Sequence, residues 1–269
     1  MSAGERMTMK IKRSEFSCMR DGLRIRGTEF RPDTGERLPI AIVSHEFMCN
    51  RLFTARYALM FAKLGFAAFC FDFCGGCIVG ASGGRTTDMS VMTEMKDLKA
   101  VIDYAESLPY TDADRLVLMG CSQGGLVSAL TAAELGDAVE RLILFYPALS
   151  IPDDARKGQM IKARIDPGNV PETFSCGVMR LGRRYAEDVM ELDPFSVISR
   201  YRGRVLIVHG NADKLVDIAY SRRAQEVYEN AILQEIDGAG HIFIAPAHVR
   251  GAVNTVRAFM RGNFSDKKQ

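Results

Sequence analysis

Ser122 is the serine of this chain whose sequence neighbours most favour a catalytic role. It is the centre of the pentapeptide Gly120–Gly124, of sequence Gly-Cys-Ser-Gln-Gly. An apolar segment, 115–119, precedes the pentapeptide, and a segment with helical periodicity, 126–135, follows it. This order is typical of a nucleophile elbow, in which a buried strand turns sharply into a helix and flanking glycines allow a strained serine backbone. A chain with 24 glycines can contain Gly-x-Ser-x-Gly by chance, but the strand and helix favour a nucleophile over an incidental serine.

A serine hydroxyl needs a base to accept its proton, and the chain has four histidines. His45 and His209 each end an apolar segment, where a hydrogen-bonded structural histidine is the simpler interpretation. His248 lies inside the last amphipathic segment. His241 instead follows a strand-like segment, on a glycine-containing loop that could carry it over the edge of a sheet. We therefore predict His241 as the base.

Asp213 is the predicted acid that orients His241, because it follows the apolar segment 205–208 in an exit turn at the same edge of the predicted sheet. Asp217 is the second choice, and Asp237 lies nearer to His241 in the sequence. Aspartate is also common in turns and at helix N-caps, which is the structural alternative for all three residues.

The elements that must position these residues follow an alternating pattern. Continuous apolar segments indicate buried strands, and the helix-period segments between them indicate helices on both faces of a mostly parallel sheet. Residues of about 10–30 show strand-like alternation, which favours an antiparallel pair. The predicted strands are 40–43, 66–71, 115–119, 142–145, 205–208 and 232–236, and the predicted helices are 51–64, 89–108, 126–135 and 245–260.

The segment 151–203 lacks a buried-strand pattern, and Pro and Gly residues divide it into short pieces rich in Lys and Arg. We predict a small cap or lid inserted across the mouth of the sheet, with 1–150 and 204–269 as the core. Its basic residues favour a carboxylate-bearing substrate or an anionic surface or, more simply, a solvated face. Its larger apolar residues could line an adaptable pocket, although ordinary packing is the simpler interpretation; they are Met160, Phe174, Met179 and Met190.

Charge and composition exclude several classes of partner. The chain has 35 Lys and Arg against 33 Asp and Glu, a balance that does not favour nucleic acid or an anionic membrane. The polar N-terminal residues do not resemble a secretory signal, and no apolar run is long enough to span a membrane. Seven cysteines suit free thiols in a reducing compartment better than a disulfide framework. We expect a globular, cytoplasmic protein.

The motifs together resemble the α/β-hydrolase superfamily over nearly the whole chain. The resemblance rests on the order Ser122, Asp213, His241, on the His-Gly-x-x-Asp segment that starts at His209, and on the Gly-x-Gly-His loop that ends at His241. The segment 71–76, with Ser-Gly-Gly at 82–84, is similar to the loop after the second core strand in bacterial feruloyl or cinnamoyl esterases. The resemblance implies an α/β-hydrolase fold with a mostly parallel central sheet flanked by helices and a small cap.

The resemblance also implies a mechanism, acyl transfer to water through Ser122, with no metal or cofactor. The backbone amides of Gln123 and Phe47 are the implied oxyanion-hole donors, the second by analogy with the His-Gly-Phe loop of these esterases. Glu46 departs from the pattern, because the family usually has glycine there. A carboxylate turned inward would oppose the oxyanion, whereas one turned outward would be harmless.

Three cysteines support a competing interpretation. Cys70, Cys74 and Cys77 have the spacing by which radical S-adenosylmethionine enzymes hold an iron–sulfur cluster. Against it, Cys70 lies in an apolar strand segment, and Gly76 replaces the aromatic residue usual before the last cysteine. A cluster would also leave the serine, aspartate and histidine unexplained. Cys49 leaves a zinc or redox site as a further alternative to buried, reduced thiols.

Two classes of function follow from these residues. The first is a serine hydrolase, most simply a carboxylesterase for aromatic or short acyl esters, with amidase or peptidase activity as a variation on the same machinery. The second is a catalytically impaired relative that binds a small acyl ligand, an alternative motivated by Glu46. The expected partner is a small-molecule ester, and a homodimer is left open.

Overall fold

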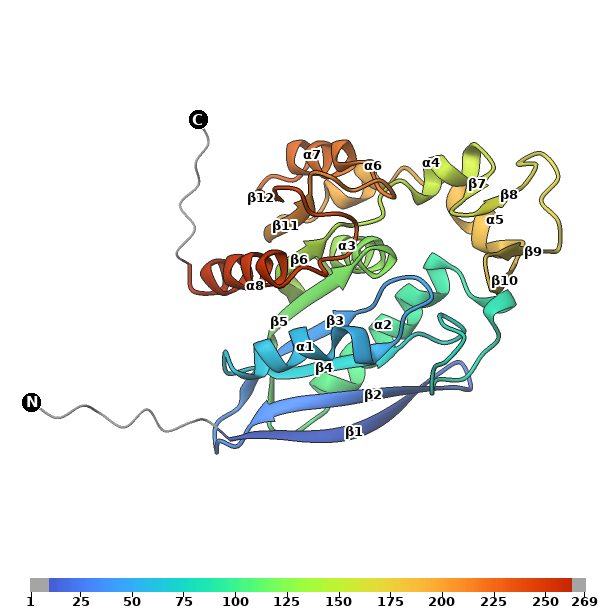
Figure 1. The fold of residues 1–269 in the computed structure, drawn as a ribbon. Coiled ribbons are helices and arrows are strands. Elements are labelled where there is room, and N and C mark those ends of the chain that lie inside the picture. Colours follow the sequence, from blue (N-terminus) through green and yellow to red (C-terminus); the bar gives the residue numbers. More distant parts are fainter. Residues whose placement is uncertain (1–9, 263–269) are drawn as a thin grey trace, which may run out of the picture.

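Eight strands form the central sheet of the computed structural model, which describes residues 10–262 (Figure 1). Strand β2 pairs antiparallel with both β1 and β4, and the other neighbours are parallel. This confirms the predicted antiparallel entry pair and parallel core. The order is β1 (Ile11–Arg20), β2 (Leu23–Pro32), β4 (Ala67–Asp72), β3 (Leu38–Ser44), β5 (Thr111–Cys121), β6 (Val139–Phe145), β11 (Arg204–Gly210) and β12 (Ala231–Ile236).

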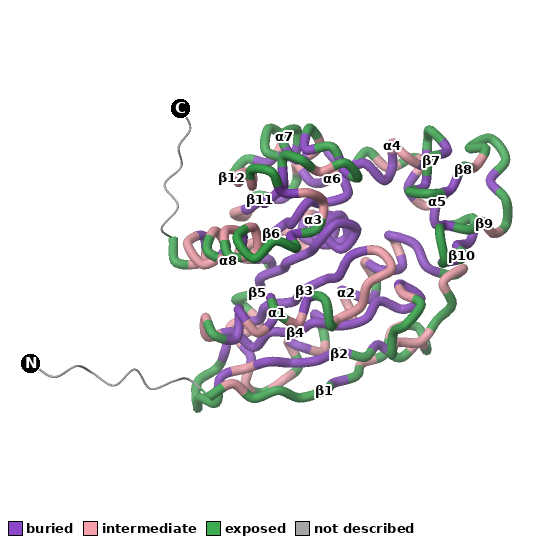
Figure 2. The backbone as a smooth tube through the Cα atoms, in the orientation of Figure 1, coloured by how far each residue is buried: buried purple, intermediate pink, exposed green. Residues whose placement is uncertain are grey.

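The central strands are apolar on both faces because each face contacts a separate layer of core. In β3, Ile40 and Ile42 pack into one cluster, and Ala41 and Val43 pack into the other. Successive side chains of a strand point to opposite faces, so a continuous apolar segment can fill both layers. Figure 2 shows the contrast with the edge strand β1, which is mostly exposed, while the central strands are buried.

Helices cover both faces of the sheet. Helices α1 (Arg51–Ala62) and α8 (Pro246–Met260) contribute to one cluster, and α2 (Val91–Glu106) and α3 (Gln123–Leu135) contribute to the other. Helix α7 (Ile218–Val227) lies with the second group and was not predicted. The sheet therefore forms the middle layer of three.

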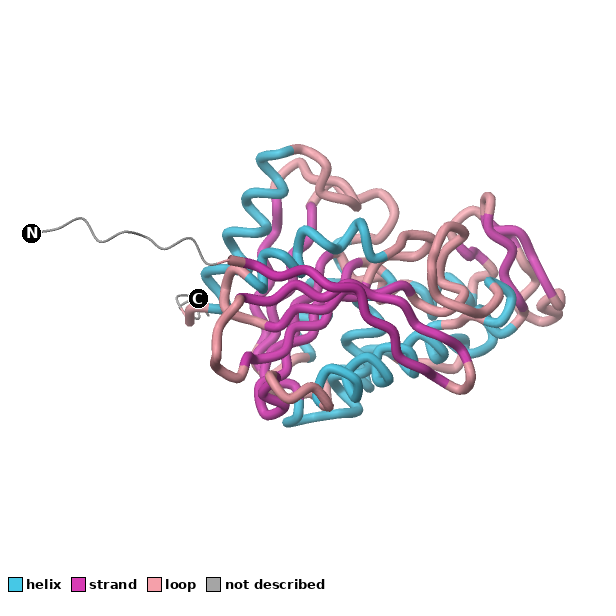
Figure 3. The backbone as a smooth tube through the Cα atoms, turned by 90° about the horizontal axis from the view of Figure 1, so that it is seen from below, coloured by secondary structure: helices cyan, strands magenta, loops and turns pink. Residues whose placement is uncertain are grey.

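The segment between β6 and β11 contains two small antiparallel sheets of two strands each, which the sequence did not predict. In Figures 1 and 3, these strands lie beyond one end of the central sheet. Helix α6 instead packs against α3 and α7 of the core. The elements are α4 (Ile151–Arg156), β7 (Gln159–Met160), β8 (Ala163–Arg164), β9 (Thr173–Cys176), β10 (Met179–Gly182), α5 (Arg184–Met190) and α6 (Pro194–Ile198).

The shorter helical turns are η1 (Thr86–Asp88), before α2, and η2 (Gly136–Ala138), after α3. Within residues 10–262, no helix combines the length and the apolar character needed to cross a membrane. The polar N-terminal residues, in which no secretory signal is expected, lie outside the described part of the chain.

Candidate active site

Ser122 occupies a sharp turn between the end of β5 and the start of α3. Its φ is 51°, in the region that favours glycine. The main chain is pinned on both sides, since the Ser122 N–H donates to the Phe145 carbonyl at 2.9 Å and the Ser122 carbonyl accepts from the Ala148 N–H at 2.9 Å. A Cβ at Gly120 would lie 2.0 Å from the Gly124 carbonyl oxygen. The turn therefore needs glycine where strand and helix approach each other.

Three side chains that are far apart in the sequence form a hydrogen-bonded chain at this turn. The Ser122 Oγ lies 2.8 Å from His241 Nε2, and His241 Nδ1 lies 2.7 Å from Asp213 Oδ2. Asp213 follows β11 and His241 follows β12, so adjacent parallel strands deliver them to the same edge of the sheet. With Nδ1–H donating to the carboxylate, Nε2 can accept the serine proton. The structure thus brings together the three residues predicted from the sequence.

Four N–H groups converge on the Asp213 carboxylate. Oδ2 accepts from His241 Nδ1 and, at 2.9 Å, from His209 Nε2. Oδ1 accepts from the backbone N–H groups of Leu215, at 2.8 Å, and Val216, at 3.1 Å. Burial alone would raise the pKa of Asp213, but the hydrogen bonds from both histidines outweigh it and hold the pKa well below its ordinary value. The acid is therefore ionised at neutral pH.

His209 is a buried histidine whose contact with Asp213 sequence reasoning missed. Its Nδ1 lies 2.7 Å from the Ser221 hydroxyl, which donates to it when Nε2–H donates to the carboxylate. The sequence signal for this contact was that His209 stands four residues before Asp213. The other candidate acids have structural roles, because Asp217 caps α7 by accepting from Ala219 N–H and Asp237 accepts from Asn211.

His45 fixes the loop that follows β3. Its Nδ1 donates to the Glu46 carbonyl at 2.7 Å, and its Nε2 accepts from the Phe73 N–H at 3.1 Å. The ring is buried, and burial lowers its pKa, which favours the neutral form. His45 is thus a satisfied structural histidine that ties this loop to the loop after β4.

The amides of Phe47 and Gln123 lie in the loop after β3 and at the first turn of α3. Within residues 10–262, neither N–H donates a hydrogen bond. The side chain of Gln123 is held at both ends, because its Nε2 donates to Glu94 Oε2 at 2.8 Å and its Oε1 accepts from the Tyr185 hydroxyl at 2.5 Å. Glu94 and Tyr185 were not predicted as site residues.

Glu46 is buried, with 7% of its surface exposed, so of the two orientations considered from the sequence the outward one is not what the structure shows. Its Oε1 accepts from the Tyr146 hydroxyl at 2.9 Å, and the Tyr146 ring lies 4.9 Å from that of His241. Burial raises the pKa of Tyr146 well above its ordinary value, which keeps the hydroxyl as a donor. This hydrogen bond ties the carboxylate to a tyrosine that also contacts His241.

The cysteines are packed as thiols rather than gathered as ligands. Cys70 Sγ contacts the Thr28 carbonyl at 3.6 Å, and Cys74 Sγ contacts the Arg24 carbonyl at 3.9 Å. Burial raises the pKa of Cys74 to about 12, which disfavours the thiolate. Among residues 10–262, no three His, Cys, Asp or Glu side chains are grouped so that they could hold a metal ion. The cluster interpretation therefore lacks its ligand set.

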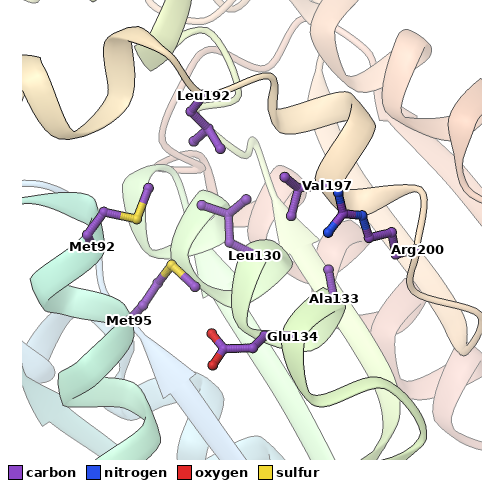
Figure 4. A pocket seen from close by; sticks show the side chains of 8 residues that line it. All are labelled: Met92, Met95, Leu130, Ala133, Glu134, Leu192, Val197 and Arg200. Atoms are coloured by element: carbon purple, nitrogen blue, oxygen red, sulfur yellow. The ribbon is translucent and has the colours of Figure 1, made fainter.

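The apolar side chains of the inserted segment, residues 151–203 between β6 and β11, pack inward. Met160, Phe174 and Met179 are buried and Met190 is partly buried, all within the larger core cluster. This favours packing over an adaptable pocket. A separate apolar cavity of 260 Å³ lies between α2, α3 and α6, lined by residues such as Met92, Leu130 and Arg200 (Figure 4). None of the three hydrogen-bonded site residues lines it.

Comparisons with known proteins agree with this fold. The family model described as serine aminopeptidase, S33, matches residues 40–173. A solved structure of Est1E from Butyrivibrio proteoclasticus with ferulic acid bound superposes with a TM-score of 0.83 at 26% identity, covering 92% of this chain and 98% of that one.

Two curated relatives are similar over shorter regions. The uncharacterized peptidase YtmA of Bacillus subtilis is 25% identical over 62% of this chain and 60% of its own length. The quorum-quenching protein AidA of Acinetobacter baumannii is 31% identical over 39% of this chain and 34% of its own length. The chain thus spans less than two thirds of either relative. The predicted fold and family are confirmed: the chain belongs to the α/β-hydrolase superfamily, as a serine hydrolase.

Proposed function

We propose that this serine hydrolase cleaves carboxylic esters through an acyl-enzyme on Ser122. The observation that carries the proposal is the continuous chain of hydrogen bonds from the Ser122 hydroxyl through His241 to Asp213, at 2.8 and 2.7 Å. Because Asp213 is ionised, it stabilises the imidazolium that forms when His241 accepts the serine proton.

The reaction has two halves that use the same groups. Ser122 Oγ attacks the ester carbonyl as its proton moves to His241 Nε2, and the tetrahedral intermediate then releases the alcohol, which takes that proton. A water molecule next gives a proton to His241 and attacks the acyl carbon, and collapse of the second intermediate returns the proton to Ser122 and releases the acid.

The amides of Phe47 and Gln123 are the proposed donors to the oxyanion in both intermediates. Their N–H groups have no acceptor among residues 10–262, and Gln123 begins a helix, whose N-terminus favours negative charge. Oε1 of Glu46 accepts from the Tyr146 hydroxyl, while its buried Oε2 has no hydrogen-bond partner among residues 10–262.

The proposed substrates are esters of aromatic or short acyl groups. The support is the likeness to Est1E, whose solved structure contains ferulic acid and which this chain matches over 98% of its length. Amide or peptide cleavage on the same residues is the second candidate. The serine aminopeptidase family model and the peptidase relative favour it.

We also propose that the protein acts in the cytoplasm. All seven cysteines lie within the described residues and are free, and three of them are only partly buried. Reduced thiols of this kind suit a compartment that keeps cysteines from forming disulfides.

A fluorophosphonate label and a substrate panel test the proposal. Wild type should be labelled on serine, and it should hydrolyse aryl and short-chain acyl esters faster than matched amides. Ser122→Ala should abolish labelling and lower turnover by at least about 10³-fold, because no other group can form the acyl-enzyme. Ser199→Ala, in a serine at the end of α6 whose hydroxyl donates to the Ser196 carbonyl, is the matched control and should behave as wild type.

Three outcomes would contradict parts of the proposal. Labelling that survives Ser122→Ala would mean that another residue is the nucleophile. Faster turnover of amides than of esters would favour the peptidase. An unlabelled and inactive wild type that still binds small acyl compounds would favour an impaired relative.

A further inference from the structure

Tyr185 is a residue of the inserted segment that contacts both residues of the proposed oxyanion hole. Its hydroxyl donates to Gln123 Oε1 at 2.5 Å, and its ring lies 5.5 Å from the ring of Phe47. The side chain is buried, with 1% of its surface exposed. We propose that Tyr185 is a positioning residue, through which docking of the inserted segment on the core holds the Phe47 and Gln123 amides in place. The inference rests on the proposed function.

Gln123 is suited to transmit the position of Tyr185 to its own backbone. Its amide side chain spans two fixed partners, Tyr185 on α5 and Glu94 on α2, so it cannot rotate without breaking a buried hydrogen bond. The backbone N–H that would bind the oxyanion belongs to the same residue. An oxyanion donor acts through its placement, and a small displacement weakens it.

The part of the chain that carries Tyr185, from β10 to α5, is fastened to the core on both sides of that residue. Before it, the Thr86 hydroxyl donates to the Arg180 carbonyl. After it, Asp188 Oδ2 accepts from the Ser90 hydroxyl at 2.5 Å. Tyr185 and Asp188 are three residues apart, so they lie on the same side of the helix. Tyr185 therefore reaches Gln123 only while this segment is docked.

In this arrangement, docking of the inserted segment affects the turnover rate more than it affects substrate binding. If the segment moves away, Gln123 loses a hydrogen bond and Phe47 loses an aromatic neighbour at the same time. Both losses affect donors that are used most strongly in the transition state, so turnover should fall more than substrate affinity.

Two substitutions separate the contacts of Tyr185. Tyr185→Phe keeps the ring against Phe47 and removes the hydroxyl, and we expect kcat and the rate of fluorophosphonate labelling to fall about tenfold, with KM within about threefold. Tyr185→Ala removes both contacts, and we expect a fall of about 100-fold. Crystal structures of both variants should show the Gln123 side chain and the loop at Phe47 displaced.

Tyr201→Phe is the matched control, because its buried hydroxyl donates to the Val139 carbonyl at 2.8 Å, away from the site. It should lower the melting temperature about as much as Tyr185→Phe and leave kcat unchanged. The inference would be overturned if both Tyr185→Phe and Tyr185→Ala were labelled at the wild-type rate and the amides of Phe47 and Gln123 had not moved. A wild type that is labelled but cleaves no ester would overturn only the proposed substrate class, because the labelling rates and structures still report on Tyr185.

Discussion

Asp213 accepts four N–H groups, and each carboxylate oxygen receives two of them. A carboxylate can satisfy this set because it is an acceptor only, with about four lone-pair positions. The two backbone donors fix the carboxylate in the turn after β11, and the two histidines fix its other oxygen. His209 thus supports the acid, while the site itself uses His241.

Asp213→Asn should lower kcat/KM by about 10²–10⁴-fold at pH 7. The amide cannot accept all four hydrogen bonds, because its NH₂ group must face either the two histidines or the two backbone N–H groups. It also cannot balance the charge of the His241 imidazolium. Steady-state kinetics on an aryl ester would measure the loss. Asp217→Asn is the control and should stay within about twofold of wild type; an equal loss there would contradict the choice of Asp213.

Helix α2 carries a buried carboxyl group directly behind the site. Glu94 lies on the face of α2 that meets α3, and its Oε2 accepts from the Gln123 side chain. Burial raises the pKa of Glu94 well above its ordinary value of 4.5, and the hydrogen bond from Gln123 only partly offsets it. The group that accepts from Gln123 is therefore an acid placed where ionisation is unfavourable.

Glu94→Gln should stabilise the protein increasingly as the pH rises from 4 to 8. A group whose folded-state pKa is raised contributes stability that is fully present below its unfolded pKa and is lost as the pH rises through its folded pKa. Glutamine keeps an acceptor oxygen for Gln123 and cannot ionise, so it avoids that loss. Urea unfolding at several pH values measures the difference from wild type. Glu134→Gln, at an exposed position of α3, should show no such trend, and a pH-independent difference for Glu94→Gln would contradict the argument.

The elements that the sequence predicted are those with strong local patterns. The strand at 205–208 and the helix at 245–260 have continuous or periodic apolar residues, and the structure contains both. Helix α7 was missed because its buried positions are Ile218, Ser221 and Ala224, two of them small, so it has no strong apolar stripe.

In the candidate site, too, the residues that could be predicted are those in a strong local pattern. Ser122, Asp213 and His241 each stand in a short motif after a strand, and the rule that parallel strands end at one edge brings them together. Tyr185 and Glu94 have no such motif, and His209 begins one but was interpreted as a structural histidine at the end of a strand. Their importance comes from contacts such as Tyr185 with Gln123, 62 residues apart, which depend on how the inserted segment docks.

At the scale of the whole molecule, the inserted segment and the core meet through an unusually close backbone contact. A Cβ built at Gly182 would lie 2.0 Å from the Thr87 carbonyl oxygen, and backbone cannot give way as a flexible side chain can. Gly182 ends β10 and lies three residues before Tyr185, next to η1 of the core. The tight contact sets how near α5 can approach Gln123.

Gly182→Ala should therefore push the docked segment outward without unfolding the core. We expect kcat to fall about 10- to 100-fold, because displacement of the proposed oxyanion donors weakens transition-state binding. Hydrogen exchange should quicken for amides of residues 179–190 and stay slow in β3, β5 and β6. Gly168→Ala is the matched control, since its Cβ would meet only the Asp166 side chain, at 3.4 Å. Should Gly182→Ala keep both wild-type turnover and slow exchange in this segment, close docking would not be what holds the site together.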